Sequence, residues 1–174
     1  MGRAAAFLAA MISAGPVLAE PQSEVLFSHK AWQVMAVAFD DGSISCDAEV
    51  SDPGESFSIW VHQDGSVQLV FFSSQWDFGE GDTANLQVEI DRRSPWRLTE
   101  AELYRQSVLF GLSDAEAGAR FINEVARGNV LYLRTEDGED VQSYSLAGSR
   151  AAIDALFQCG DALPATSPSN PFKN

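Results

Sequence analysis

An alternation of apolar and polar side chains with a period of two dominates the first two thirds of this 174-residue chain. Trp32, Val34 and Ala36 begin the pattern, and turn sequences interrupt it at short intervals. Two of these turns contain the pairs Asp41-Gly42 and Asp64-Gly65, which suit the left-handed backbone of a tight hairpin. Because alternation places one apolar face on a strand, these segments are predicted to be antiparallel strands joined as consecutive hairpins. They are the segments beginning at 32, 44, 57 and 67.

The remaining third alternates less regularly and contains two helical patterns. Ser113 is a predicted helix N-cap with Glu116 as its capping-box partner, and Gly128 is expected to end that helix. A second helix is expected to begin at 148–149 and to carry Cys159 near its end. Further strands are predicted at 86–90, 96–98, 107–112, 130–134 and 142–146.

These elements predict a mainly β fold, an antiparallel sandwich or flattened barrel of about seven to nine strands with two peripheral α-helices. Residues 20–160 are expected to form this single β-rich domain. Residues 161–174 are rich in Pro, Ser and Asn and are expected to be a disordered C-terminal tail.

Residues 1–19 have the features of a secretory signal peptide. Arg3 precedes an apolar stretch of about a dozen residues, shorter than the roughly 20 that cross a membrane. Val17 and Ala19 supply the small side chains that signal peptidase requires, so cleavage is expected after Ala19. The mature chain is therefore expected in the periplasm or outside the cell, without a transmembrane segment.

Charge and cysteine content restrict the partners further. Asp and Glu number 25 against 11 Lys and Arg, a formal net charge of −14 that disfavours nucleic acid as a partner. Cys46 and Cys159 are the two cysteines, and in an oxidising compartment they are expected to form a disulfide. The alternative, a catalytic thiol, would need a basic partner from His29 or His62.

Two segments give the chain a resemblance to a known family. Trp32-Gln33-Val34, followed by Cys46, and the stretch from Tyr144 to Ser149 resemble the invasion-associated locus B-like small secreted proteins of alphaproteobacteria. The resemblance covers both ends of the mature domain, and the additional Cys pair typical of the family's central region is absent. It implies a β-sandwich with peripheral helices, an extracytoplasmic location and no established enzymatic activity.

The stretch 75–84 is Gly-rich and acidic and is predicted to be a loop. Trp76 and Phe78 lie in it, so the sequence offers two alternatives: an exposed aromatic anchor for a partner, or a lid folded over the core. Asp77, Glu80 and Asp82 raise the question of a weak cation site, although their spacing differs from that of an EF-hand. A solvated turn explains the same residues.

No catalytic motif stands out in the sequence. The histidines lack the context of a hydrolase triad, and no Gly-x-Ser-x-Gly elbow is present. The leading functional hypothesis is therefore a non-enzymatic periplasmic or secreted binding or accessory protein of the cell envelope, with a protein or envelope component as partner and no cofactor. The alternative is a hydrolase or enzyme inhibitor whose site is built from scattered residues.

Overall fold

A computed structural model describes residues 22–164, except for the side chain of Glu80. The predicted signal peptide and all but the first four residues of the predicted tail lie outside this range. None of the helices in the described range is long and apolar enough to cross a membrane.

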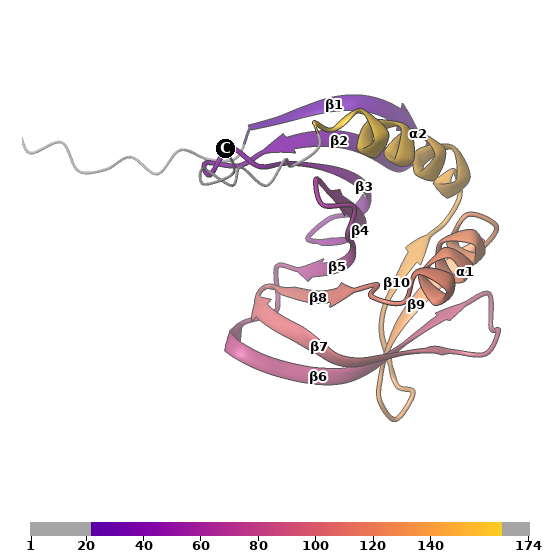
Figure 1. Ribbon diagram of the computed structural model, residues 1–174. Coiled ribbons are helices and arrows are strands. Elements are labelled where there is room, and N and C mark those ends of the chain that lie inside the picture. Colours follow the sequence, from indigo (N-terminus) through magenta and orange to yellow (C-terminus); the bar gives the residue numbers. More distant parts are fainter. Residues whose placement is uncertain (1–21, 165–174) are drawn as a thin grey trace, which may run out of the picture.

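Ten antiparallel strands form one sheet in the order β1-β2-β3-β4-β5-β8-β7-β6-β9-β10. The sheet curls from β1 at the top of Figure 1, through β5 and β8, to β6 at the bottom, and both helices lie at its open side. The strands are β1 (Gln22–His29), β2 (Trp32–Ala38), β3 (Ile44–Asp52), β4 (Glu55–His62), β5 (Val67–Ser73), β6 (Phe78–Ile90), β7 (Trp96–Arg105), β8 (Ser107–Gly111), β9 (Val130–Thr135) and β10 (Asp140–Ser145).

The last strand of the sheet, β10, faces strands β2 to β5 across an aromatic interior. Tyr144 of β10 packs against Phe57 of β4 and Phe71 of β5, with ring centroids 5.8 and 6.2 Å away. Trp32 of β2 donates a hydrogen bond from Nε1 to the carbonyl of Ser145 at 3.2 Å. The sheet is not closed by strand pairing, but it folds over on itself, which confirms a mainly β fold of the sandwich or flattened-barrel type.

The consecutive hairpins predicted from the alternation are confirmed for β2 through β5. The strand count exceeds the expected seven to nine because β1 was not predicted. This strand lies at the sheet edge with most of its side chains exposed, so it lacks the one-sided apolar pattern that identifies the others.

The loop predicted at 75–84 is wrong from Phe78 onward, because β6 begins there. Its first half pairs with β7 through register shifts between Phe78 and Glu80 and again between Glu80 and Asp82. Such bulges insert extra residues without ending the strand, and they coincide with Gly79 and Gly81. Backbone pairing with β7 therefore overrides the low β-propensity of this composition.

Two helices complete the fold, α1 (Ala115–Val125) and α2 (Ser149–Ala162). The N-cap of α1 is Asp114 rather than the predicted Ser113, because the Asp114 carboxylate accepts a hydrogen bond from the Ala117 amide at 2.9 Å. The start of α2 agrees with the prediction, and its end at Ala162 lies two residues beyond the expected domain boundary.

Candidate ligand-binding groove

A groove of about 750 Å³ lies between α1, α2 and the β4–β5 turn. Its lining comes from the β4–β5 turn, the start of β5, the segment before α1, α1 with the residues that follow it, and α2. Its lining residues are Asp64, Gly65, Ser66, Val67, Leu112, Ser113, Ala115, Gly118, Ala119, Ile122, Asn123, Ala126, Arg127, Arg150, Ile153, Asp154 and Phe157.

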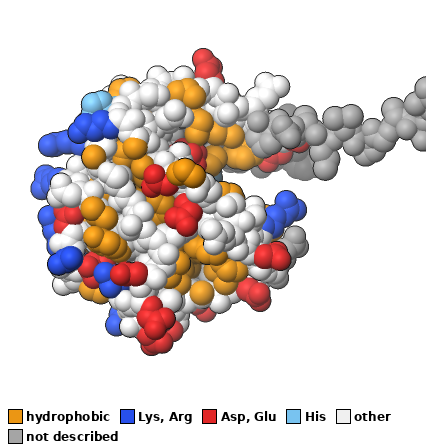
Figure 2. Space-filling view, turned by 180° about the vertical axis from the view of Figure 1, so that it is seen from behind, with side chains coloured by type: hydrophobic (Ala, Val, Ile, Leu, Met, Phe, Trp, Pro, Cys, Tyr) orange, Lys and Arg blue, Asp and Glu red, His pale blue; other side chains and the backbone are white. Residues whose placement is uncertain are grey.

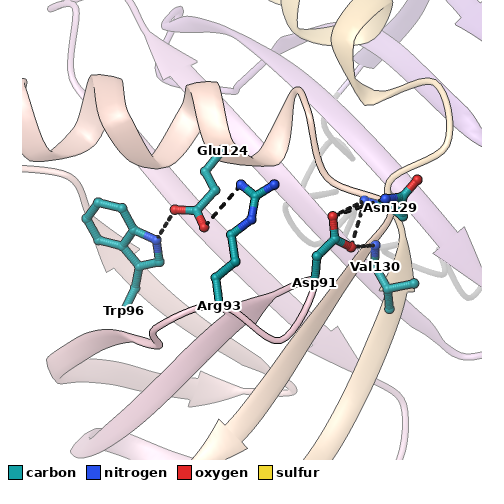
Figure 3. Close-up of polar contacts among 6 residues, drawn as sticks. All are labelled: Asp91, Arg93, Trp96, Glu124, Asn129 and Val130. Carbon is teal, nitrogen blue, oxygen red and sulfur yellow. Dashed lines mark hydrogen bonds and ion pairs between the residues drawn. The ribbon is translucent and has the colours of Figure 1, made fainter.

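The first wall, α1, is held on the sheet by polar contacts with the β6–β7 turn and the first residue of β7. Glu124 on α1 accepts a hydrogen bond from Trp96 Nε1 at 2.8 Å and forms an ion pair with Arg93 at 3.6 Å (Figure 3). The Trp96 ring packs edge-on against Phe121 on the inner face of the same helix, with centroids 5.5 Å apart. These contacts hold the inner face of α1 on the sheet and leave the side that carries Ile122 and Ala119 for the groove.

The chain that leaves α1 is held by Asp91 of the same turn. The Asp91 carboxylate accepts hydrogen bonds from the backbone amides of Asn129 and Val130 at 2.9 and 3.0 Å (Figure 3). Desolvation raises the pKa of this carboxyl, but the hydrogen bonds from Val130 and Asn129 outweigh it and leave the pKa below its ordinary value. The ionised Asp91 carboxylate therefore fixes the backbone between the end of α1 and the start of β9.

The second wall, α2, is held to the sheet by the predicted disulfide. Cys46 of β3 and Cys159 of α2 are bonded, with their Cα atoms 6.0 Å apart, which confirms the pairing. At the other end of α2, Ser149 Oγ donates a hydrogen bond to the carbonyl of Val125 on α1 at 2.9 Å. The two helices are thus joined where α1 ends and α2 begins, and the groove extends from this junction.

The β4–β5 turn closes the far end of the groove. His62 and Ser66 pair through a backbone hydrogen bond of 3.0 Å, and Gly65 adopts a φ of 82°, which L side chains rarely take. Asp64 accepts hydrogen bonds from the amide and the hydroxyl of Ser66. Those bonds lower the pKa of the Asp64 carboxyl, so at neutral pH it is ionised and engaged within its own turn.

The floor of the groove is apolar because α1 and α2 each direct one isoleucine into it. Ile122 and Ile153 are 7% and 4% exposed, and Val67 and Leu112 are half-buried beside them. Along this side α1 otherwise presents small residues, namely Ala115, Gly118, Ala119 and Ala126. Because none of these side chains is large enough to bridge to α2, the space between the helices stays unfilled, and Phe157 on α2 remains 40% exposed.

Arginine side chains gather around the groove. Arg127 and Arg150 line it, and Arg93, Arg120 and Arg127 line an adjoining hollow on the other side of Asn123. In Figure 2, seen from behind, most of the blue side chains lie along the left edge, the side occupied by α1 and the β6–β7 turn in Figure 1. Two arginines therefore line the groove itself, together with Asp64 and Asp154, in a protein whose formal net charge is −14.

The aromatic pair that the sequence singled out lies elsewhere. Trp76 precedes β6 and Phe78 is its first residue. Both side chains are half-buried, their ring centroids are 5.4 Å apart, and both pack against the hydrophobic core. The two rings therefore lie on the core, as the lid alternative describes, and neither is fully exposed.

The candidate cation site is spread along the start of β6. Asp77 and Asp82 are exposed, and Asp82 lies over the backbone of Gly79. Among the described side chains, which exclude that of Glu80, no three His, Cys, Asp or Glu residues converge as metal ligands would.

The outer face of the sheet contains polar side chains that the sequence alone did not place next to each other. Ser45 Oγ lies 2.8 Å from His62 Nδ1, across the pairing of β3 with β4. Ser45 is 3% exposed, so this hydroxyl is enclosed in the sheet surface rather than open to an approaching substrate. Asp47, two residues further along β3, is 2% exposed, and its Oδ1 has no hydrogen-bond partner among the described residues.

The groove residues were not predicted as a site from the sequence. The two helical patterns gave Ile122, Ile153 and Phe157 as apolar positions, but the pattern alone does not distinguish a core contact from a groove floor. The available signal was the combination of an apolar stripe, small residues on α1 and arginines at the helix ends. Comparison of the chain with protein-family models, with curated proteins and with solved structures finds no match in any of the three.

Proposed function

We propose that this chain is a non-enzymatic binding protein of the periplasm or extracellular space, and that its ligand occupies the groove between α1 and α2. The observation that carries the proposal is an apolar floor, formed around Ile122 and Ile153, under an unfilled volume of about 750 Å³. Sites for small organic ligands have volumes of about 300–1,000 Å³, apolar linings and a few polar groups. The resemblance to invasion-associated locus B-like proteins is part of the same proposal.

The Cys46–Cys159 disulfide supports the location. Disulfides persist in oxidising compartments, and this one fits a periplasmic or extracellular protein. It also supports the site, because it fixes the second wall of the groove to β3. A wall held by a covalent bond is pre-organised, which reduces the entropy lost when a ligand binds.

Binding accounts for the groove better than hydrolysis does. The polar groups of the lining are two arginines, two aspartates, two serines and an asparagine, and the Ser66 hydroxyl is already bonded to Asp64. The contact between Ser45 and His62 lies in the outer face of the sheet with its hydroxyl enclosed. The groove thus offers groups that hold a ligand, rather than an activated nucleophile beside a bound substrate.

A neutral fluorescent probe tests this proposal. Nile red becomes brightly fluorescent in an apolar environment, and we expect the purified, oxidised protein to bind it saturably. Ala119 is exposed on the groove side of α1, so Ala119→Trp should fill the groove and abolish the signal without loss of stability.

Gln158→Trp is the matched control, because Gln158 is exposed on α2 and does not line the groove. It adds the same indole to the same region and should leave Nile red binding unchanged. No saturable binding to the wild type, or equal binding to the wild type and to Ala119→Trp, would contradict the proposed site.

A further inference from the structure

We infer that the groove selects a single-chain carboxylate, a free fatty acid of medium chain length, and that Arg127 and Arg150 hold its carboxylate group. The inference rests on the proposed function, since it assigns the ligand class of that same groove. Its basis is the combination of an apolar floor with two arginines at one end that form no ion pair within the described residues.

Both arginines belong to the junction of the two helices. Arg127 lies two residues after Val125, and Arg150 directly follows Ser149, the residue whose hydroxyl bonds to the Val125 carbonyl. Both side chains line the groove. Two guanidinium groups are therefore placed at the same end, where a carboxylate entering between the helices would meet them.

Neither guanidinium has a carboxylate partner in the described part of the chain. The ion pairs there engage Arg93 with Glu124, Arg120 with Glu116, and Arg134 with Glu89 and Asp140. Asp154 follows Arg150 by one helical turn without forming an ion pair with it, and Asp64 is engaged by Ser66. Arg127 and Arg150 are thus available for the charge-assisted, bidentate contacts that guanidinium makes with carboxylate.

The net charge of the protein does not prevent an anion from binding here. At physiological ionic strength, exposed charges more than about 8 Å away are largely screened, so the local charge outweighs the total. The Arg93 and Arg120 side chains of the adjoining hollow are already paired with Glu124 and Glu116, so they add little to the local charge. A carboxylate at the helix junction would therefore be held by direct contacts with Arg127 and Arg150, within a protein whose formal charge is −14.

The chain of the ligand would run from the helix junction over the apolar floor. Ile122 and Ile153 form its centre, Phe157 forms a partly exposed wall, and Leu112 and Val67 lie toward the β4–β5 turn. Each methylene buried along this path removes a similar apolar area from water, which corresponds to about a fourfold gain in affinity. The groove should therefore rank carboxylates by length as well as by charge.

Displacement of Nile red by matched ligands tests the inference. We expect hexanoate, octanoate and decanoate to displace it with affinities that rise about fourfold per methylene. Decanol, which has the same chain without the charge, should bind at least tenfold more weakly than decanoate, and decylammonium more weakly still. Isothermal titration calorimetry with decanoate supplies the affinity without a probe.

The variant Arg127→Gln/Arg150→Gln separates charge from shape. Both residues are exposed, so the double variant should fold and bind decanol as the wild type does, while decanoate affinity falls at least tenfold. Arg105→Gln is the control, because Arg105 is equally an exposed arginine but lies at the end of β7 and outside the groove. It should leave decanoate binding unchanged.

The outcomes distinguish the inference from the proposal beneath it. If Nile red and decanol bind in the groove but decanoate binds no better than decanol, the carboxylate assignment is overturned and the binding groove stands. Tighter binding of decylammonium would overturn it in the same way. If sedimentation shows a dimer that Ala119→Trp dissociates, the occupant is a second copy of the chain and the fatty acid is excluded. If neither Nile red nor any of the ligands binds saturably, the proposed function itself fails.

Discussion

Asp47 predicts an unusual dependence of stability on pH. This residue lies on β3 opposite Met35 of β2 and Trp60 of β4, with 2% of its surface exposed and Oδ1 unpartnered among the described residues. Burial, followed by repulsion from Glu49, raises the pKa of its carboxyl from 3.8 to about 8. The folded protein therefore holds a proton on Asp47 at neutral pH, whereas the unfolded chain does not.

The sign and size of the effect follow from linkage. Because the folded pKa is raised, the stability contributed by the protonated group is complete below pH 3.8 and is lost as the pH rises through about 8. Between these values each pH unit costs about 1.4 kcal/mol. At pH 7 the penalty is thus about 4 kcal/mol relative to pH 3.8. Asp47→Asn keeps the shape and removes the ionisation, so the variant should be more stable than the wild type by about that amount.

Urea unfolding at a series of pH values measures this difference. We expect the free energies of unfolding of wild type and Asp47→Asn to converge near pH 4 and to separate steadily up to pH 8. Asp137→Asn, at an exposed hairpin tip, removes the same charge and should show no such separation. The reasoning would be refuted if the unfolding free energies of wild type and Asp47→Asn differed by the same amount at every pH. It would also be refuted if the advantage of the variant were smaller at pH 7 than at pH 4.

Three further changes test how the fold supports the groove. Replacing Cys46 and Cys159 with Ser opens a loop with a sequence separation of 113 residues, so urea unfolding should show a free energy of unfolding lower by about 4–5 kcal/mol. Nile red binding should also weaken, because α2 is no longer bonded to β3. Gly128→Ala would place a Cβ within 2.6 Å of a methyl group of Ile90, so thermal unfolding should show a stability lower by about 1–3 kcal/mol. An unchanged melting temperature would contradict the tight packing after α1. Trp76→Ala/Phe78→Ala removes two half-buried rings that pack on the core, so the protein should lose about 3 kcal/mol while still binding Nile red; full stability would instead favour an exposed anchor.

Local sequence signals predicted the parts of the fold that depend on neighbouring residues. The hairpins from β2 to β5 follow from alternation and turn residues within a few positions of each other, as at Asp64-Gly65. Strand β6 depends instead on pairing with β7, and Gly79 and Gly81 conceal it because glycine has a low strand propensity. The N-cap of α1 moved from Ser113 to Asp114 because both side chains suit a cap and only the backbone conformation decides between them.

The groove was beyond the reach of local signals because its walls meet only in the folded chain. Val67 and Phe157 line the same groove although they are separated by most of the domain. The disulfide, by contrast, was predictable, because Cys46 and Cys159 allow one intramolecular pairing. That bond carried the only long-range information the sequence offered about where α2 packs.

The most direct test of the binding groove is the location of a bound ligand. Decanoate titrated into isotopically labelled, oxidised protein should shift the backbone amide resonances of α1, the first half of α2 and the β4–β5 turn, with the largest changes near Ile122, Arg127 and Ile153. Resonances of the Trp76–Phe78 segment, which does not line the groove, should stay in place. Shifts confined to that segment, or no shifts at millimolar decanoate, would contradict the account.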